Sequence, residues 1–424
     1  MIQIKKIISN HAKIVENFFS LSILNVTNYI FPIILIPYLV RVLGAEYYGK
    51  YIFASTIIHY FYLFIQYGFD LSATKEIALI RENKQIVNEI YSSVMFIRVL
   101  FNILGILLMM FLCRFIPMMR NDSTLFLLGC GIFIGQSITP IWLFQGIEQM
   151  KYITSVNFFS RAIGFALIFI LIKSATDYKY VLFLQSLGFI SGAIISLIIV
   201  HKHVGIRFIK PSLEQIKQQL QKGWHIFLST IGMNFYRESN IFILGILTNY
   251  TTVGYYAPAE KIVKAIQSFA SPFVTALFPS LSRTLSKKDD KGSIAQYKRI
   301  GKSFSIILLL ITILLFLTAK IFLNIYLGEN FDKTIIDLRI LSFVILFGGM
   351  NYYYGIAGLV NLGYADYFAK AVWISGIASI LICTITSHYL KDVGAAIAML
   401  SAEIILFIII ISKYIKNKIL VTHL

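Results

Sequence analysis

Long apolar stretches, each about as long as a bilayer is thick, follow one another along the whole chain. A helix needs ~20 apolar residues to cross hydrocarbon, and about twelve windows of this kind can be placed between short polar connections. With a mean hydropathy of +0.76 and only 14% charged residues, a soluble protein of 424 residues could not hide so much apolar surface. We therefore expect an all-α polytopic membrane protein. The expected spans lie near residues 18–40, 49–70, 91–115, 124–146, 153–173, 180–201, 224–248, 254–281, 303–326, 335–360, 367–389 and 394–412.

Lys and Arg residues are distributed unevenly between alternate connections. With the N-terminus inside, the cytoplasmic connections hold more than twice as many of them as the opposite ones. This bias predicts a multi-pass protein with both termini in the cytoplasm. The first apolar run lacks a cleavage site of small residues, so we expect it to remain as a span. The net charge of +18 then reflects loops that face an anionic leaflet, and we expect no nucleic-acid partner.

The two halves of the chain resemble each other in sequence. "LGAEYYGKYIFAS" follows the first span and "LTNYTTVGYYAPAEK" follows the seventh, and their alignment sets Gly49 opposite Gly254. Both halves begin on the same side of the membrane, so the repeats are parallel. We expect two pseudo-symmetric six-helix bundles around a central cavity, with residues 1–201 in the first, 224–424 in the second and a cytoplasmic linker at 202–223.

Two spans that the repeat makes equivalent carry polar residues along one helical face. An amphipathic helix among apolar spans should line a water-filled space, so these faces predict the walls of the cavity. The face of the second span holds Ser55, Thr56, His59, Tyr62, Gln66 and Asp70. The face of the eighth span holds Glu260, Lys264, Gln267, Ser268, Ser271 and Thr275, with Lys261 at its edge.

Other charges inside apolar spans are candidates for the same cavity. Asn234, Arg237 and Glu238 share a face of the seventh span, and Arg98, Arg161 and Lys370 lie one to two turns inside other spans. Each has a structural alternative. Arg98, Arg161 and Lys370 could extend to the lipid headgroups, and Arg237 with Glu238 could form a neutral structural pair. His59 could be a buried histidine with its hydrogen bonds satisfied, and Asp70 could cap the following helix.

Several kinds of chemistry have no signal in the sequence. There is no phosphate-cradling Walker loop, and Cys113, Cys130 and Cys383 all lie in apolar runs without metal-site spacing, so we expect neither a disulfide nor a metal. No external loop exceeds about twenty residues, unlike the loops in which membrane polymerases place acidic catalytic groups. We therefore expect a secondary transporter without a cofactor rather than an enzyme, and its internal cations favour an anionic cargo.

Three stretches resemble a known family. "PIWLFQGIEQMKYITSVNFFSR", "QYGFDLSATKEIA" and "VGYYAPAEKIVKAIQSF" with "ALFPSLSR" are similar to the Wzx-type O-antigen flippases of the multidrug/oligosaccharidyl-lipid/polysaccharide exporter superfamily. The resemblance implies transport of undecaprenyl-diphosphate-linked oligosaccharide repeat units from the cytoplasmic to the periplasmic leaflet of the bacterial inner membrane. Membrane lipids would surround the chain, and the polymerase and chain-length proteins of the same pathway are expected partners.

The resemblance and the polar faces together predict two sets of site residues. Glu238, Glu260 and Asp70 are expected to couple transport to a proton or a sodium ion. The cargo-binding set comprises Arg237, Lys261, Lys264, His59, Asn234, Gln267, Arg98, Arg161 and Lys370. Two other functions stay open: a drug/cation antiporter of the same superfamily, which would need an acidic cavity, and a membrane glycosyltransferase or polymerase.

Overall fold

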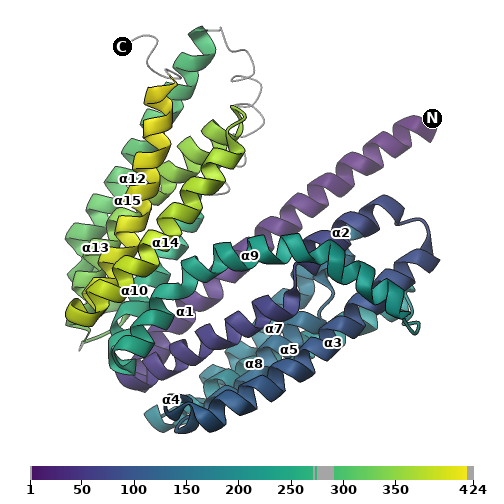
Figure 1. Cartoon of the computed structure of the whole chain (residues 1–424), viewed down its shortest axis with the longest axis horizontal. Coiled ribbons are helices and arrows are strands. Elements are labelled where there is room, and N and C mark those ends of the chain that lie inside the picture. Colours follow the sequence, from purple (N-terminus) through teal and green to yellow (C-terminus); the bar gives the residue numbers. More distant parts are fainter. Residues whose placement is uncertain (1, 271–272, 275–290, 330, 418–424) are drawn as a thin grey trace. The chain divides into compact units, whose positions relative to one another are not determined.

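The structure, a computed structural model, describes residues 2–270, 273–274, 291–329 and 331–417, without the side chains of 2–26, 28–29, 232–237 and 291–294. All regular structure in these ranges is helical (Figure 1), which confirms the expected all-α class. Nine helices in the described part are long and apolar enough to cross a membrane. The seventh and eighth expected spans are not in this group, and part of each lies outside the described residues.

The helices follow the expected spans with small shifts at their ends, because long apolar runs fix where a helix lies better than where it stops. In chain order they are α1 (Ile2–Gln66), α2 (Phe69–Ile80), α3 (Lys84–Phe115), α4 (Pro117–Arg120), α5 (Ser123–Ile138), α6 (Ile141–Gly146), α7 (Met150–Leu171), η1 (Ala175–Asp177), α8 (Tyr178–Ile199), η2 (Val200–Val204), α9 (Leu213–Leu247), α10 (Tyr250–Ser268), α12 (Lys291–Tyr326), α13 (Asp332–Met350), η3 (Asn351–Val360), α14 (Ala365–Leu390) and α15 (Asp392–Lys416).

Three features differ from the expected spans. The first two spans are joined in α1 by a kink at Gly44, whose φ of 69° and ψ of 173° only glycine adopts readily. The fourth span divides into α5 and α6 next to Pro140, which lacks the N–H that a continuous helix would use. The polar stretch of the expected linker and the seventh span form the single helix α9.

The chain divides into two compact units. Unit 1 consists of residues 1–38 and 54–232, and unit 2 consists of residues 39–53 and 233–424. The start of α9 is tied to unit 1, where Lys222 Nζ donates to Glu76 Oε1 of α2 at 2.7 Å. The sequence-based division at 202–223 stays a prediction.

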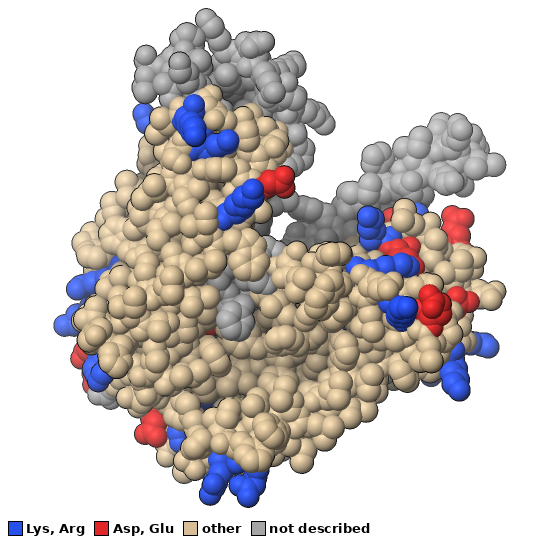
Figure 2. All heavy atoms as spheres, viewed as in Figure 1, with Lys and Arg blue, Asp and Glu red and all other residues tan. Residues whose placement is uncertain are grey.

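The two units use the same order of helix packing. In unit 1, α5 packs on α3 and α8, and α7 packs on α8; in unit 2, α13 packs on α12 and α15, and α14 packs on α15 (Figure 1). These helices correspond to the third to sixth expected spans of each half, so the contacts agree with the repeat found in the sequence. The surface fits a membrane protein, because charged side chains gather at helix ends and uncharged residues cover the surface between them on the face shown (Figure 2).

Gly49 of α1 and Gly254 of α10, which the repeat makes equivalent, lie where these two helices contact each other within unit 2. A Cβ added to Gly49 would lie 1.7 Å from Tyr250 O and 2.9 Å from Gly254 N, and a Cβ added to Gly254 would lie 1.8 Å from Ala45 O. No larger residue fits unless the two backbones separate. Close backbone approach through small residues is typical of helix contacts in membranes.

We predict that two glycine-to-alanine changes differ in their effect on stability. Gly254→Ala should lower the stability of the protein by roughly 1–3 kcal/mol because the added methyl overpacks the contact. Gly105→Ala in α3 is the matched control, since its Cβ would meet no atom closer than 3.4 Å; it should leave stability unchanged or raise it by up to ~1 kcal/mol through helix propensity. Thermal unfolding of both variants in detergent tests this, and equal melting curves would contradict the tight contact.

Candidate functional site

A lysine lies between two carboxylates inside unit 2. Lys264 Nζ of α10 lies 3.0 Å from Glu260 Oε1 of the same helix and 3.3 Å from Glu238 Oε1 of α9. The side chain of Glu260 is only 1% exposed, whereas those of Lys264 and Glu238 are 28% and 34% exposed. Three of the predicted site residues are therefore in one cluster. Lys261, at the edge of this face of α10, is half-buried.

A second polar group continues along the same face of α10. Gln267 Nε2 donates to Glu403 Oε1 of α15 at 3.2 Å, and Asn351 Nδ2, at the first residue of η3, donates to Glu403 Oε2 at 2.7 Å. Gly348 makes room for this arrangement, because a Cβ there would lie 1.8 Å from Gln267 Nε2. Four helical elements thus contribute polar side chains to the interior of unit 2.

Sequence reasoning missed Glu403 and Asn351. Glu403 is the one acidic residue inside the last expected span, at 394–412, and an ionisable residue in a spanning helix is a functional candidate by default. That signal was available. The signal for Asn351 comes from the structure, where this residue begins a π-helix. π-Helical turns are frequent at functional sites.

A separate ion pair lies inside unit 1. Arg98 of α3 is 1% exposed; its Nη2 donates to Asp70 Oδ1 at 2.6 Å and its Nη1 donates to Ser137 O at 2.8 Å. Gln66 Nε2 donates to the other carboxylate oxygen of Asp70. Arg98 does not extend to the lipid headgroups, and Asp70 is no cap, since Gly68 is the N-cap and Asp70 belongs to the first turn of α2.

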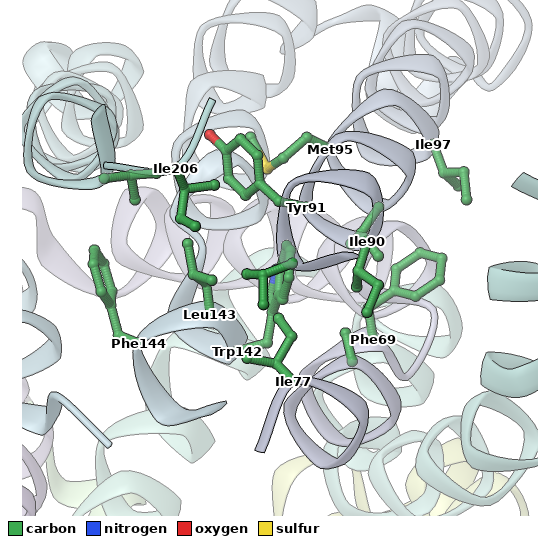
Figure 3. Close-up of a cluster of buried hydrophobic side chains, with 14 of the residues drawn as sticks. Phe69, Ile77, Ile90, Tyr91, Met95, Ile97, Trp142, Leu143, Phe144 and Ile206 are labelled. Atoms are coloured by element: carbon green, nitrogen blue, oxygen red, sulfur yellow. The ribbon is translucent and has the colours of Figure 1, made fainter. Parts of the chain in front are cut away.

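This ion pair rests on the motif that carries the family resemblance. Thr74 of α2 donates to Trp142 O of α6 at 3.1 Å, and the buried Trp142 ring lies in the core of unit 1 near Ile77, Ile90 and Tyr91 (Figure 3). The motif therefore holds α6 against α2, which positions Asp70.

The remaining predicted residues are dispersed. His59 is half-buried and lies next to Tyr62, with ring centroids 6.1 Å apart. Arg161 is half-buried over the ring of Phe189 at 5.9 Å, and Lys370 is exposed. The side chains of Asn234 and Arg237 lie outside the described residues, as does the continuation of the α10 face at Ser271 and Thr275. Within the described chain, no group of three or more His, Cys, Asp or Glu side chains could hold a metal ion.

We predict that Arg98 and Asp70 are strongly coupled. Arg98→Met leaves a carboxylate without its cation in the protein interior, so it should lower stability by about 3 kcal/mol or more. The double variant Arg98→Met with Asp70→Asn should recover most of that loss. A thermal-unfolding double-mutant cycle in detergent measures the coupling, with the exposed Lys370→Ala as control; additive losses would contradict a shared interaction.

Comparison with known proteins gives the same family over most of the chain. Residues 14–285 match the family described as "Polysaccharide biosynthesis protein". A curated relative named "Putative O-antigen transporter" from Escherichia coli (strain K12) is 30% identical and covers 97% of this chain and 99% of its own length. A relative of the same name from Shigella dysenteriae is 29% identical over 63% of this chain and 67% of its own.

Two solved structures have a similar fold. The lipid II flippase MurJ in an inward closed conformation has a TM-score of 0.72 at 13% identity and covers 97% of this chain and 90% of its own. An inward-facing multidrug resistance MATE family transporter of the MOP superfamily has a TM-score of 0.68 at 14% identity, with 92% and 95% covered. Identities this low show the fold alone. The chain is thus a multi-pass membrane protein with the fold of these transporters, and it belongs to the family of polysaccharide biosynthesis proteins.

Proposed function

We propose that the protein is a flippase that moves undecaprenyl-diphosphate-linked O-antigen oligosaccharide repeat units from the cytoplasmic to the periplasmic leaflet of the bacterial inner membrane by alternating access. The observation that carries the proposal is the relative named "Putative O-antigen transporter", which aligns over nearly the full length of both chains. The charged interior of unit 2 supports it, because ionisable residues within spanning helices mark substrate and ion pathways.

The cargo explains why the interior is polar. A diphosphate with several sugars cannot cross hydrocarbon, whereas its polyprenyl tail never has to leave it. A charged head needs cations and hydrogen-bond donors that replace the water it loses. Lys264, Lys261 and Gln267 offer such groups along one face of α10, and Arg237 of α9 is proposed to add a further cation.

The contacts of Lys264 favour reversible binding. Its ammonium already has carboxylates at 3.0 Å and 3.3 Å, so a phosphate oxygen would have to compete with Glu238 for it. Protonation of Glu238 would weaken that competition and favour the anion. We therefore propose that a proton on Glu238 couples to cargo binding at Lys264, while Glu260, which is almost fully buried, keeps the lysine in place.

We predict that Lys264→Met lowers O-antigen display at least ~10-fold, since removing a charge-assisted contact to a phosphate is worth about 1.5–3 kcal/mol. Display on cells that lack their own flippase, normalised to the amount of protein in the membrane, measures the effect. The exposed Lys151→Ala is the control. Normal display by Lys264→Met with equal protein would contradict cargo binding at this lysine.

We also predict that Glu238→Gln removes the dependence of transport on a proton gradient. A neutral amide cannot exchange a proton, although it still accepts a hydrogen bond from Lys264. Transport of the lipid-linked oligosaccharide into vesicles is measured with the gradient intact and collapsed. The wild type should slow when the gradient collapses and Glu238→Gln should run at one rate; a variant that still responds would exclude Glu238 as the proton carrier.

A further inference from the structure

Aromatic side chains from α1 and α9 are stacked at one end of unit 1. Tyr67, the residue that follows α1, stacks on Phe227 of α9 with ring centroids 4.6 Å apart and an interplanar angle of 25°. Trp224, one turn before Phe227, lies 5.7 Å from it, and Phe64 lies 6.0 Å from it. Trp224 and Phe64 are 45% and 53% exposed. We call these four residues the aromatic platform.

The backbone around the platform is shaped to bring the two helices together. Tyr67 has a φ of 48°, which is unfavourable for a residue with a side chain, and Gly68 after it has a φ of 74°. A Cβ on Gly223 of α9 would lie 2.9 Å from Tyr67 O and 3.0 Å from the Tyr67 ring. Strained residues persist where the surrounding structure requires them, and they cluster at functional sites.

The platform is continuous with the buried ion pair of unit 1. The Tyr67 ring lies 5.3 Å from the ring of Phe69, and the guanidinium of Arg98 lies 5.9 Å from that same ring. Arg98 and Gln66 both hydrogen-bond the carboxylate of Asp70, whose side chain is 22% exposed. This connection runs through Phe69, which is fully buried. Gln66 directly precedes Tyr67 and Asp70 directly follows Phe69, so an amide and a partly exposed carboxylate lie next to the platform along the chain.

We propose that the aromatic platform, with Asp70 and Gln66 beside it, binds a sugar ring of the transported oligosaccharide. One face of a pyranose consists of C–H groups and packs on the negative face of an aromatic ring, while its hydroxyl groups need carboxylate and amide partners at the edge. The platform offers the first kind of surface, and Gln66 and Asp70, its neighbours along the chain, offer the second. The inference rests on the proposed function, and it adds to that function the recognition of a sugar by unit 1.

Tryptophan at the end of a spanning helix also serves as an anchor at the membrane interface, so the test must separate the two roles. The chain has three tryptophans: Trp142 is fully buried, and Trp373 of α14 is 46% exposed, as Trp224 is. Trp373→Phe leaves Trp224 as the exposed emitter, and Trp224→Phe leaves Trp373. These two variants form a matched pair for fluorescence.

Each variant is placed in lipid nanodiscs and titrated with undecaprenyl-diphosphate-linked oligosaccharide extracted from cells that lack the protein. Sugar-free undecaprenyl diphosphate is the control ligand. Emission from Trp224 should change with the glycolipid and not with the sugar-free lipid, whereas emission from Trp373 should change with neither. Quenching of Trp224 by brominated lipids to the same degree as Trp373, without a response to the glycolipid, would overturn the proposal in favour of a membrane anchor.

Display on cells gives an independent readout. Trp224→Leu should lower O-antigen display roughly three- to tenfold, as expected for the loss of one aromatic contact, while Trp224→Phe should keep most of it and Trp373→Leu all of it. Full display by Trp224→Leu, with binding of the glycolipid that still depends on Lys264, would remove the platform and leave the flippase function intact. No display and no glycolipid binding by the wild type would remove the proposed function itself.

Discussion

The cost of holding a charge away from water determines much of the interior of this protein. A charge at the centre of a spanning helix costs at least about 3 kcal/mol, so each buried one needs a partner of opposite sign or several hydrogen bonds. Arg98 meets this requirement with Asp70 and Ser137 in unit 1. Lys264 meets it with Glu238 and Glu260 in unit 2. The helices that carry these groups are thereby fixed to one another.

The two polar clusters differ in a way that suits different tasks. Arg98 is enclosed and held by carboxylate and backbone oxygens, which makes it a positioning group for Asp70. Lys264 keeps part of its surface open, and one of its two carboxylate partners is open as well. A group that must bind and release an anion repeatedly needs that access. The enclosed cluster supports a surface, whereas the open cluster can exchange partners.

The sequence predicted which residues share a helical face, but it did not predict which helices those residues contact. Periodicity predicted that Glu260, Lys264 and Gln267 share one face of a helix. In unit 2, Lys264 contacts Glu238 of α9 and Gln267 contacts Glu403 of α15. Which helix lies opposite cannot be read from spacing, because it depends on the packing of elements distant in the chain. A helix after Asp70 was expected, but the break between α5 and α6 was missed, since the apolar run of the fourth expected span continues across it. The Trp142 motif, which identified the family, proved to be a packing contact between α2 and α6.

The unbroken course of α9 has a consequence for how this chain can vary. Its first turns are fastened to unit 1 through Lys222 and Glu76, and the same helix carries Glu238 to Lys264 in unit 2. Each residue of an α-helix advances the side-chain direction by about 100°. Within unit 1, a residue inserted or deleted beside Lys222 would turn its ammonium away from Glu76, and within unit 2, one beside Glu238 would turn its carboxylate away from Lys264. A substitution leaves the direction of every other side chain of α9 unchanged, so near each attachment the number of residues is constrained more tightly than their identity.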